Sequence, residues 1–522
     1  MLDLLLVGGS VVDGSSSPGF AGWVGVGGDR ILRVGREAES EPDSAQRIDV
    51  GERMIVPGFI DVHNHSDLSP LFDPDMPSAL RQGVTTLVVG NCGASPWPLA
   101  GFADCLGYAG GDSASTAVPA WDGFGDYLDA IQATRPSINI AALVGHGAIR
   151  TEVLGLDRRP PTSRELARMR VSVAKAMDAG AIGFSTGLIY VPGMFSDTEE
   201  LVALAEKAGA AGGIYTSHIR GEGERLFDAV SEALEVGRRA GVSAHVSHLK
   251  CESSLVHGRA AEVLSLIHGA EDATADQYPY AAWNSHLSSL LPPWAPVEEI
   301  ASITTDRGTS EKLRTAVEEG GAGFQSSVKG VGWDHIVVVG TADRRWNGRD
   351  IAGIARTMGV EPISAAVHLL SEDPNTTCTG HAMSEADVRT ILSDPEVLVA
   401  SDGTAMSPDG PNGHLPVHPR EYGTFPRAIA LCRDEDLLPF EAVIRKMTSL
   451  PAERFGLAGR GRIEEGAVAD LVILDPARGR DTATFDNPHS DPEGLDSVLV
   501  NGRLAWGGVN PLPDRPGRVL KA

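Results

Sequence analysis

The chain has 522 residues, 42% of them hydrophobic and 22% charged, which is typical of a folded globular protein and excludes a disordered one. Its formal net charge of −26 excludes nucleic acid and anionic membranes as primary partners, because both bind clustered lysine and arginine. The five cysteines are few and scattered, and no apolar run reaches about 18 residues, so we expect a cytoplasmic protein without disulfides or a membrane span.

The two ends of the chain share a pattern that the middle lacks. Residues 1–55 hold short strand patterns separated by Gly, Ser and Asp turns, and a similar pattern returns at residues 469–474 and 497–504. A chain of this length predicts more than one unit, since single cores rarely grow beyond about 250 to 300 residues. We therefore predict a small β-sandwich built from residues 1–55 and 455–522.

Residues 56–454 alternate between strand and helix patterns, which predicts a parallel sheet. Helix starts are marked by capping boxes at Thr162 and Ser196, each followed three residues later by Glu. Residues 283–377 break the rhythm and predict an insertion, although a strand pattern at 336–339 leaves the strand count open. Eight strands, typical of a (β/α)8 barrel, are predicted to end near His65, Cys92, His146, Thr186, His218, His248, Tyr280 and Asp402.

Several polar residues fall at the ends of these predicted strands. His63 and His65 lie two apart, so both imidazoles face the same side of their strand. Barrel enzymes keep their active sites at the carboxyl ends of the strands, where such side chains can meet. Imidazoles combined with one thiolate favour zinc over magnesium or calcium. The candidate ligands are His63, His65, Cys92, His218, His248 and Asp402.

A zinc ion at this place would favour hydrolysis of an amide. Bound zinc lowers the pKa of water to about 7 and polarises a carbonyl group. Asp402 fits a general base and then a general acid, because hydrolysis moves a proton from water to the departing amine. Taken singly, Cys92 also reads as a buried thiol and Asp402 as a turn residue, but their shared position at strand ends favours the metal site.

Longer motifs connect the chain with a known family. It resembles the amidohydrolase superfamily, and within it the N-acyl-D-amino-acid deacylases (D-aminoacylases), in stretches such as PGFIDVHNHSD, GVTTLVVGNCG, GFSTGLIYVPG, YTSHIRGEG, DQYPY and HPREYGTFPR. The resemblance implies a tightly held zinc on Cys92, His218 and His248. It implies a weaker or optional second site on His63, His65 and Asp402, with Asp402 as the acid/base. It also implies D-configured N-acyl amino acid substrates, whose α-carboxylate is held by Tyr190, Lys250, Tyr278 and Arg420.

Some features depart from the family pattern or favour other functions. Trp283 and Asn284 stand where the family commonly has a small Gly-Ser pair, which leaves the substrate's side chain open. One alternative is a cyclic-amide hydrolase of the dihydropyrimidinase or dihydroorotase kind, but those usually carry a carboxylated lysine on the fourth strand, which here reads AIGFSTG. Another is a non-catalytic scaffold on the same barrel. The G-x-S-x-G match at Ser185 lacks an α/β-hydrolase context.

Overall fold

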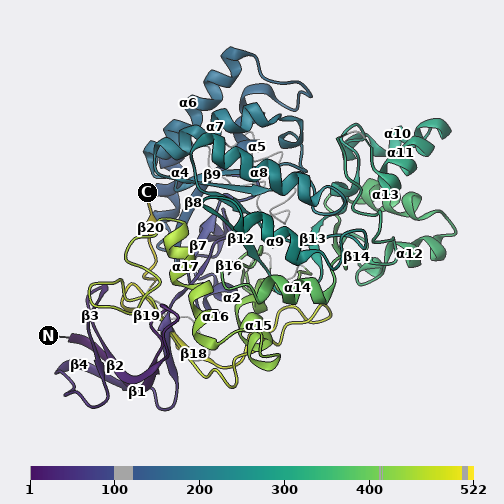
Figure 1. The fold of residues 1–522 in the computed structure, drawn as a ribbon. Coiled ribbons are helices and arrows are strands. Elements are labelled where there is room, and N and C mark those ends of the chain that lie inside the picture. The colour runs from purple at the N-terminus through teal and green to yellow at the C-terminus, as the bar shows by residue number, and fades with distance from the viewer. Residues whose placement is uncertain (1, 99–120, 322, 411–412, 414–415, 508–514) are drawn as a thin grey trace.

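The computed structural model describes residues 2–98, 121–321, 323–410, 413, 416–507 and 515–522 (Figure 1). A barrel lies in the middle, with a small sheet from the chain's ends at one side and a helical insertion at the other. Cys105 and most of the predicted loop 94–120 lie outside the described residues. No helix in the described part of the chain is long and apolar enough to cross a membrane.

Parallel strands form the barrel wall, and each pairs with the next along the chain. Every residue of β7 and β8 is buried, because helices cover one face of the wall and barrel side chains fill the other. The predicted (β/α)8 fold is therefore confirmed. The eight strands found among the described residues are β6 (Phe59–Asp61), β7 (Val84–Val89), β8 (Asn139–Gly145), β9 (Gly183–Gly187), β10 (Ile214–His218), β11 (Ala244–Val246), β12 (Ala273–Gln277) and β16 (Val397–Val399).

The first and last strands, β6 and β16, close the barrel through a short seam. The backbone N–H of Asp402 donates to the carbonyl of His63 at 2.8 Å. The buried carboxylate of Asp61 accepts from the backbone N–H and the hydroxyl of Ser401 at 2.9 and 2.6 Å. These bonds join segments 340 residues apart, and they place three candidate ligands at one point of the ring.

One of the two predicted helix starts outside the barrel wall is present, and the other lies one residue further on. The capping box at Thr162 is confirmed, because its hydroxyl accepts from Glu165 N–H and Glu165 bonds back. The box at Ser196 is wrong: Asp197 caps the next helix, since its carboxylate accepts the N–H of Glu200 at 2.8 Å, and Asp caps as well as Ser. The helices that follow or flank the barrel strands are α1 (Ser69–Phe72), α2 (Pro77–Leu80), α4 (Phe124–Ala133), α5 (His146–Leu154), α6 (Ser163–Ala179), α7 (Thr198–Ala210), α8 (Leu226–Ala240), α9 (Ala260–His268), α14 (Glu385–Leu392), α15 (Arg420–Asp434), α16 (Phe440–Met447) and α17 (Ser449–Arg454).

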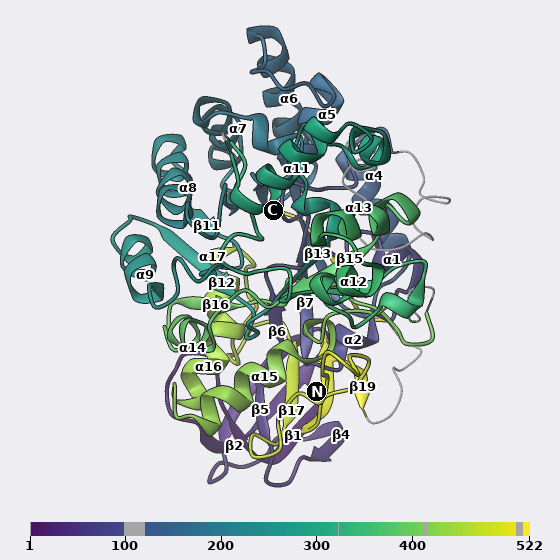
Figure 2. The same cartoon turned by 90° about the vertical axis from the view of Figure 1, so that its right-hand side faces the viewer.

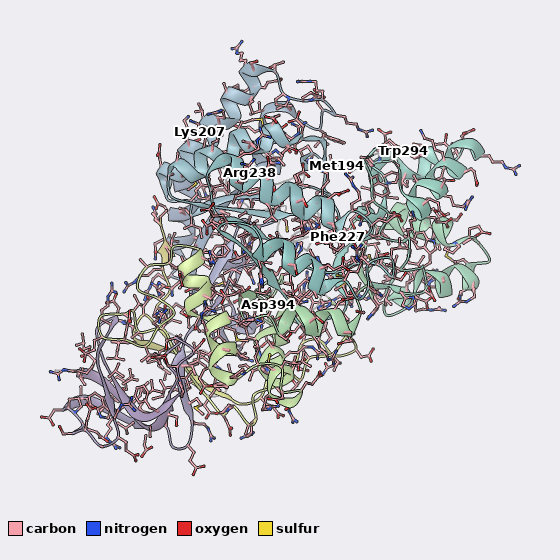
Figure 3. The ribbon with its side chains drawn as sticks, viewed as in Figure 1. Met194, Lys207, Phe227, Arg238, Trp294 and Asp394 are labelled. Carbon is pink, nitrogen blue, oxygen red and sulfur yellow. The ribbon has the colours of Figure 1, made fainter. Side chains whose placement is uncertain are left out.

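The insertion has its own antiparallel sheet of β13 (Trp283–His286), β15 (Thr377–Gly380) and β14 (Ile336–Gly340) (Figure 2). The extra strand pattern at 336–339 therefore belongs to the insertion and not to the barrel. Trp283 packs across Gly380, in the same apolar cluster as Tyr278 and Tyr280. The ring centre of Trp294, a residue labelled in Figure 3, lies 4.5 Å from Lys312 Nζ. The helices here are α10 (Ile300–Ile303), α11 (Arg307–Glu319), α12 (Ile351–Met358) and α13 (Pro362–Glu372).

The two ends of the chain pair with each other, as the sequence predicts, through Ile55 and Ile473. Their strands form one continuous sheet, where a β-sandwich was expected. The pattern at 497–504 forms two strands, because Asn501 and Gly502 take positive φ of 49° and 75° and turn the chain as Asn-Gly pairs do in hairpins. The sheet comprises β1 (Leu2–Val11), β2 (Phe20–Gly27), β3 (Arg30–Arg36), β4 (Ser44–Asp49), β5 (Met54–Pro57), β17 (Leu471–Leu474), β18 (Leu495–Val500) and β19 (Arg503–Gly507).

The last strand, β20 (Val519–Leu520), pairs with the barrel strand β8 rather than with the terminal sheet. A buried polar network lies beside this junction. The Asp470 carboxylate accepts the N–H of Asn501 at 2.7 Å and pairs with Arg460. The Asn501 amide donates to Asn139 on β8 at 2.7 Å. The network therefore ties the terminal sheet to the barrel.

Removing one member of this network is expected to destabilise the whole protein. Asp470→Ala should lower the free energy of unfolding by about 3 to 5 kcal/mol, because it leaves the Arg460 guanidinium buried without its counter-charge. Urea unfolding followed by circular dichroism measures the loss. In contrast, Glu493→Ala should cost less than about 1 kcal/mol, since its partner Arg480 is 60% exposed. Equal losses in the two variants would contradict the structural role.

Candidate active site

All six predicted ligands come together at the carboxyl ends of the barrel strands. His63 and His65 follow β6, Cys92 follows β7 and His218 ends β10. His248 follows β11, and Asp402 follows β16. Each side chain is buried. Three groups of residues have ligand atoms within 4.8 Å of one another: His63, His65 and Cys92; Cys92, His218 and His248; and His63, His248 and Asp402.

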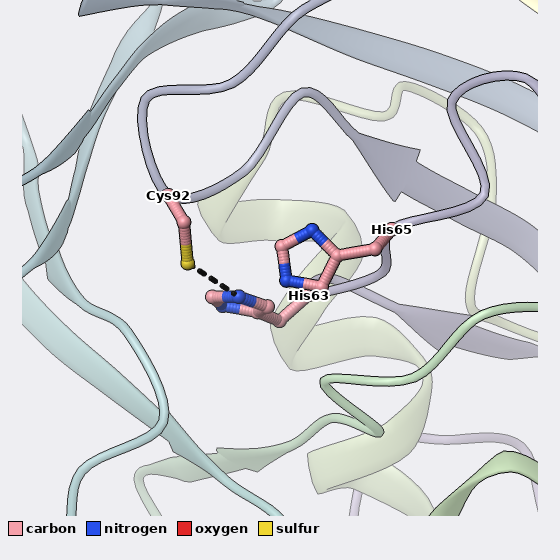
Figure 4. Close-up of side chains that lie close together, drawn as sticks. All are labelled: His63, His65 and Cys92. Carbon is pink, nitrogen blue, oxygen red and sulfur yellow. Dashed lines mark hydrogen bonds between the residues drawn. The ribbon is translucent and has the colours of Figure 1, made fainter. Parts of the chain in front are cut away.

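The thiol of Cys92 is the common element of two of these groups. Its Sγ lies 3.3 Å from His63 Nε2, the contact drawn in Figure 4, and 3.6 Å from both His218 Nδ1 and His248 Nε2. The family resemblance implied Cys92 as a ligand of the tighter position alone. In the structure its sulfur is within reach of His63 and His65 as well. One thiolate can therefore face two adjacent metal positions.

Three site residues have a backbone conformation that is costly for residues other than glycine. Cys92, His248 and Asp402 have φ of 53°, 36° and 50°. Each lies two or three residues beyond the end of a strand, so this left-handed turn redirects a side chain that continued extended backbone would aim elsewhere. Such conformations cost of order 1 to 3 kcal/mol each and cluster at functional sites. The strain indicates that side-chain placement takes precedence over stability here.

The charges of the site favour the ionised forms of its acids. Burial alone would raise the pKa of the Cys92 thiol, but the charge of His63 and hydrogen bonds from the imidazoles of His218, His248 and His63 hold it well below its usual range. Burial likewise opposes ionisation of Asp402, yet Arg420 and the imidazoles hold the pKa of its carboxyl well below normal. The surroundings of Cys92 and Asp402 thus favour the ionised form of each, which is the form that binds a metal.

Two buried carboxylates that orient the imidazoles were missed by the sequence reasoning. Asp276, on β12, lies 2.7 Å from His245 Nε2 and 3.6 Å from His63 Nδ1. Glu222, in the loop after β10, lies 3.0 Å from His248 Nδ1. Both belong to motifs that were recognised, DQYPY and YTSHIRGEG. A charged residue inside a predicted barrel strand was the available signal for Asp276, since unpaired buried charges are costly.

The residues expected to hold a substrate carboxylate lie around one aromatic ring. Lys250 Nζ is 5.6 Å and Arg420 Cζ 5.1 Å from the centre of the Tyr278 ring. The Tyr278 hydroxyl is buried, and no hydrogen-bond partner for it exists among the described residues. Arg420 also donates to Asp402 at 2.8 Å. The ring of Tyr190, the fourth of these residues, lies edge-on to His218, with 4.8 Å between the two ring centres.

Ser185 and His146, which could be taken for catalytic residues, are hydrogen-bonded within the fold. The Ser185 hydroxyl accepts the N–H of Gly93 at 3.1 Å and donates to the carbonyl of Gly90, so it fastens the strand end that carries Cys92. His146 lies 2.8 Å from Glu200 Oε1, and Arg150 donates to both oxygens of that carboxylate. We therefore find no support for a serine nucleophile at this site in the described structure.

The fold and the site define the class of protein as a metal-dependent hydrolase barrel, since such enzymes hold a metal at the carboxyl ends of their strands. Comparison with known proteins supplies the particular family. The chain belongs to the amidohydrolase family, whose model matches residues 46–283 and 323–505, and within it to the N-acyl-D-amino-acid deacylases.

Two relatives from Alcaligenes xylosoxydans xylosoxydans match along nearly the whole chain. A D-aminoacylase is 35% identical over 99% of this chain and 97% of its own length. An N-acyl-D-glutamate deacylase is 37% identical over 100% and 96%. The solved N-acyl-D-glutamate deacylase of Bordetella bronchiseptica, complexed with zinc and a phosphonate that mimics the tetrahedral intermediate, has a TM-score of 0.81, 33% identity and full coverage of both chains.

Cyclic-amide hydrolases are similar in fold alone. The L-hydantoinase of Arthrobacter aurescens covers 100% of both chains with a TM-score of 0.58, but its sequence is 16% identical. In this chain β9 carries no lysine, and the thiol of Cys92 lies between the two groups of imidazoles. The cyclic-amide alternative therefore loses its support.

Proposed function

We propose that this protein uses zinc to hydrolyse the amide bond of N-acyl-D-amino acids. The observation that carries the proposal is a group of cationic and hydroxyl side chains, which we take as a receptor for a carboxylate, beside the cluster of candidate metal ligands. Lys250, Arg420 and the unpaired hydroxyl of Tyr278 offer charge and hydrogen bonds to an anion in a chain of net charge −26. The D configuration is supported by the names of the full-length relatives.

The donor set fits zinc. A thiolate with two imidazoles, from Cys92, His218 and His248, is a common zinc environment, and hard ions such as magnesium prefer oxygen ligands. We assign one tightly held zinc to these residues and a weaker second position to His63, His65 and Asp402. When bound, zinc would polarise the amide carbonyl and lower the pKa of water.

The remaining residues bind the substrate and move its protons. Asp402 accepts a proton from the attacking water as the C–O bond forms, and then delivers that proton to the amine nitrogen as the C–N bond of the tetrahedral intermediate breaks. Arg420, which contacts Asp402 at 2.8 Å, also reaches toward the receptor around Tyr278. One guanidinium thus aligns the acid/base with the substrate's α-carboxylate. The products are a carboxylic acid and a free D-amino acid.

The charges near the receptor favour an uncharged substrate side chain. Among the described residues, the buried Lys and Arg side chains include Lys250 and Arg420 near the receptor. The side chains of Arg150, Lys446 and Arg460 are also buried, but they are bonded to Glu200, to backbone carbonyls and to Asp470. Glu252 lies two residues after Lys250, and burial together with the charge of Glu222 raises its pKa to about 8. An acidic side chain would meet further carboxyl groups instead of a third cation.

A substrate panel tests both parts of the proposal. Zinc-loaded protein is incubated with N-acetyl and N-formyl derivatives of D- and L-leucine, D-glutamate and D-aspartate, and with a hydantoin, while amine release is followed. We expect kcat/KM to be at least about 100-fold higher for D- than for L-leucine, a difference of about 2.7 kcal/mol. Turnover of L-forms alone or of the hydantoin alone would overturn the assignment.

The panel also separates the remaining alternatives. The kcat/KM for N-acetyl-D-leucine should exceed that for N-acetyl-D-glutamate by at least about tenfold, since burying one uncompensated charge costs more than about 1.4 kcal/mol. The opposite order would show that an acidic side chain finds a cation. A protein that binds zinc but turns over none of these amides would instead be the non-catalytic scaffold. Protein treated with a chelator is the control for metal dependence.

A further inference from the structure

Glu222 lies between a candidate zinc ligand and the substrate-binding lysine. Its Oε1 is 3.0 Å from His248 Nδ1 and 2.7 Å from Lys250 Nζ. Lys250 Nζ is itself 3.0 Å from His248 Nδ1, so the three groups form a closed triangle. All three side chains are buried, and the second oxygen of Glu222 lies 3.8 Å from Nε2 of His218. Whether His248 Nδ1 carries a hydrogen therefore depends on whether it bonds to the carboxylate of Glu222 or to the ammonium of Lys250.

The two neighbours favour opposite tautomers of His248. Its Nε2 faces Cys92 Sγ at 3.6 Å, so Nε2 is the atom directed toward the metal position and must carry no hydrogen when it binds. An ammonium group has donors and no acceptor, whereas an ionised carboxylate has acceptors and no donor. Lys250 alone would donate to Nδ1 and place the hydrogen on Nε2. Glu222 accepts an Nδ1–H and leaves Nε2 free.

We propose that Glu222 is a positioning residue that holds His248 in its metal-binding tautomer against the influence of Lys250. The inference deepens the proposed function and rests on it. Carboxylates beside ligand imidazoles are a general means of fixing ring tautomer and orientation. Here the same oxygen also holds the ammonium that binds the substrate's carboxylate. Glu222 therefore allows Lys250 to lie next to His248 while His248 keeps the tautomer that can bind zinc.

Size-matched variants test this role through zinc affinity, measured by competition with a chromophoric chelator. Glu222→Met removes the acceptor and should weaken zinc binding by about 10- to 100-fold. Glu222→Gln keeps an oxygen that can accept Nδ1–H and should lose less than about tenfold by the same reasoning. Glu252→Met, a nearby buried carboxyl group with no bond to His248, is the matched control and should keep wild-type affinity.

The decisive experiment adds Lys250→Met to Glu222→Met. Removing the competing donor should restore zinc affinity at least about fivefold over the single variant, a gain of about 1 kcal/mol. A packing role for Glu222 predicts the reverse, because two substitutions disturb the site more than one. No recovery in the double variant, or wild-type affinity in Glu222→Met, overturns the inference. If the wild type binds zinc but deacylates nothing, the proposed function fails. The zinc affinities of the variants would still decide the inference about Glu222.

Discussion

Replacing Asp402 with asparagine is expected to lower kcat by about 10²- to 10⁴-fold, the usual contribution of a general acid–base group, while zinc content stays near that of the wild type. Asparagine keeps the size of the side chain and tolerates the φ of 50° found there, but it cannot take a proton from water. Turnover of N-acetyl-D-leucine and metal analysis of the same samples measure the two quantities.

The control for this variant is Asp409→Asn, the same chemical change at an exposed position seven residues along the chain. It should leave both kcat and zinc content unchanged. Retained turnover in Asp402→Asn would refute the proton-transfer role. Loss of zinc together with turnover would instead show that Asp402 acts chiefly as a ligand, since it lies 3.1 Å from His65 Nε2 and 3.4 Å from His63 Nε2.

Cys92→Ala is expected to remove the metal and all activity with it. Because changes next to a ligand already cost 10- to 100-fold in affinity, loss of the shared ligand should weaken zinc binding by more than about 100-fold. The three nearby imidazoles would also lose the negative charge that they surround. Zinc retained after dialysis, measured by atomic absorption, reports the effect.

Cys378→Ala is the matched comparison, because Cys378 is also a free, buried cysteine but lies in the insertion on β15. Both variants leave a cavity of similar size, so any common loss reflects packing. Zinc retained by the Cys378 variant and lost by the Cys92 variant would identify the sulfur as the cause. If both retain zinc, the assignment of Cys92 to the metal position is wrong.

The barrel was predictable because its signals are local. β-Branched runs such as the one ending at Val89 predict buried strands, and polar residues that follow them fall at the carboxyl edge whatever the rest of the chain does. The His63 and His65 pair could be assigned to one side by the alternation of a strand alone. The family motifs then supplied roles that spacing does not contain.

The remaining features depend on contacts between distant segments. Glu222 and His248 become partners because β10 and β11 are adjacent, which no local pattern states. The left-handed turn at Cys92 follows from where its side chain must point, not from any preference of cysteine. The competition between Ser196 and Asp197 for the start of α7 was decided by a single hydrogen bond. Sequence patterns alone do not distinguish Ser196 from Asp197 as the N-cap residue, because both residue types are favoured at this position.

The pairing of β20 with β8 has a consequence for shortened forms of the protein. The carbonyl of Arg518 accepts the N–H of Ile140 at 2.9 Å, and Val519 lies opposite Ile140. Proteolytic removal of β20 would leave the backbone groups of β8 at Ile140 and Ala141 without this partner. Open strand edges of this kind recruit other chains and promote aggregation. This short segment thus completes the backbone hydrogen bonding of β8 before Leu143, where β9 begins to pair with it.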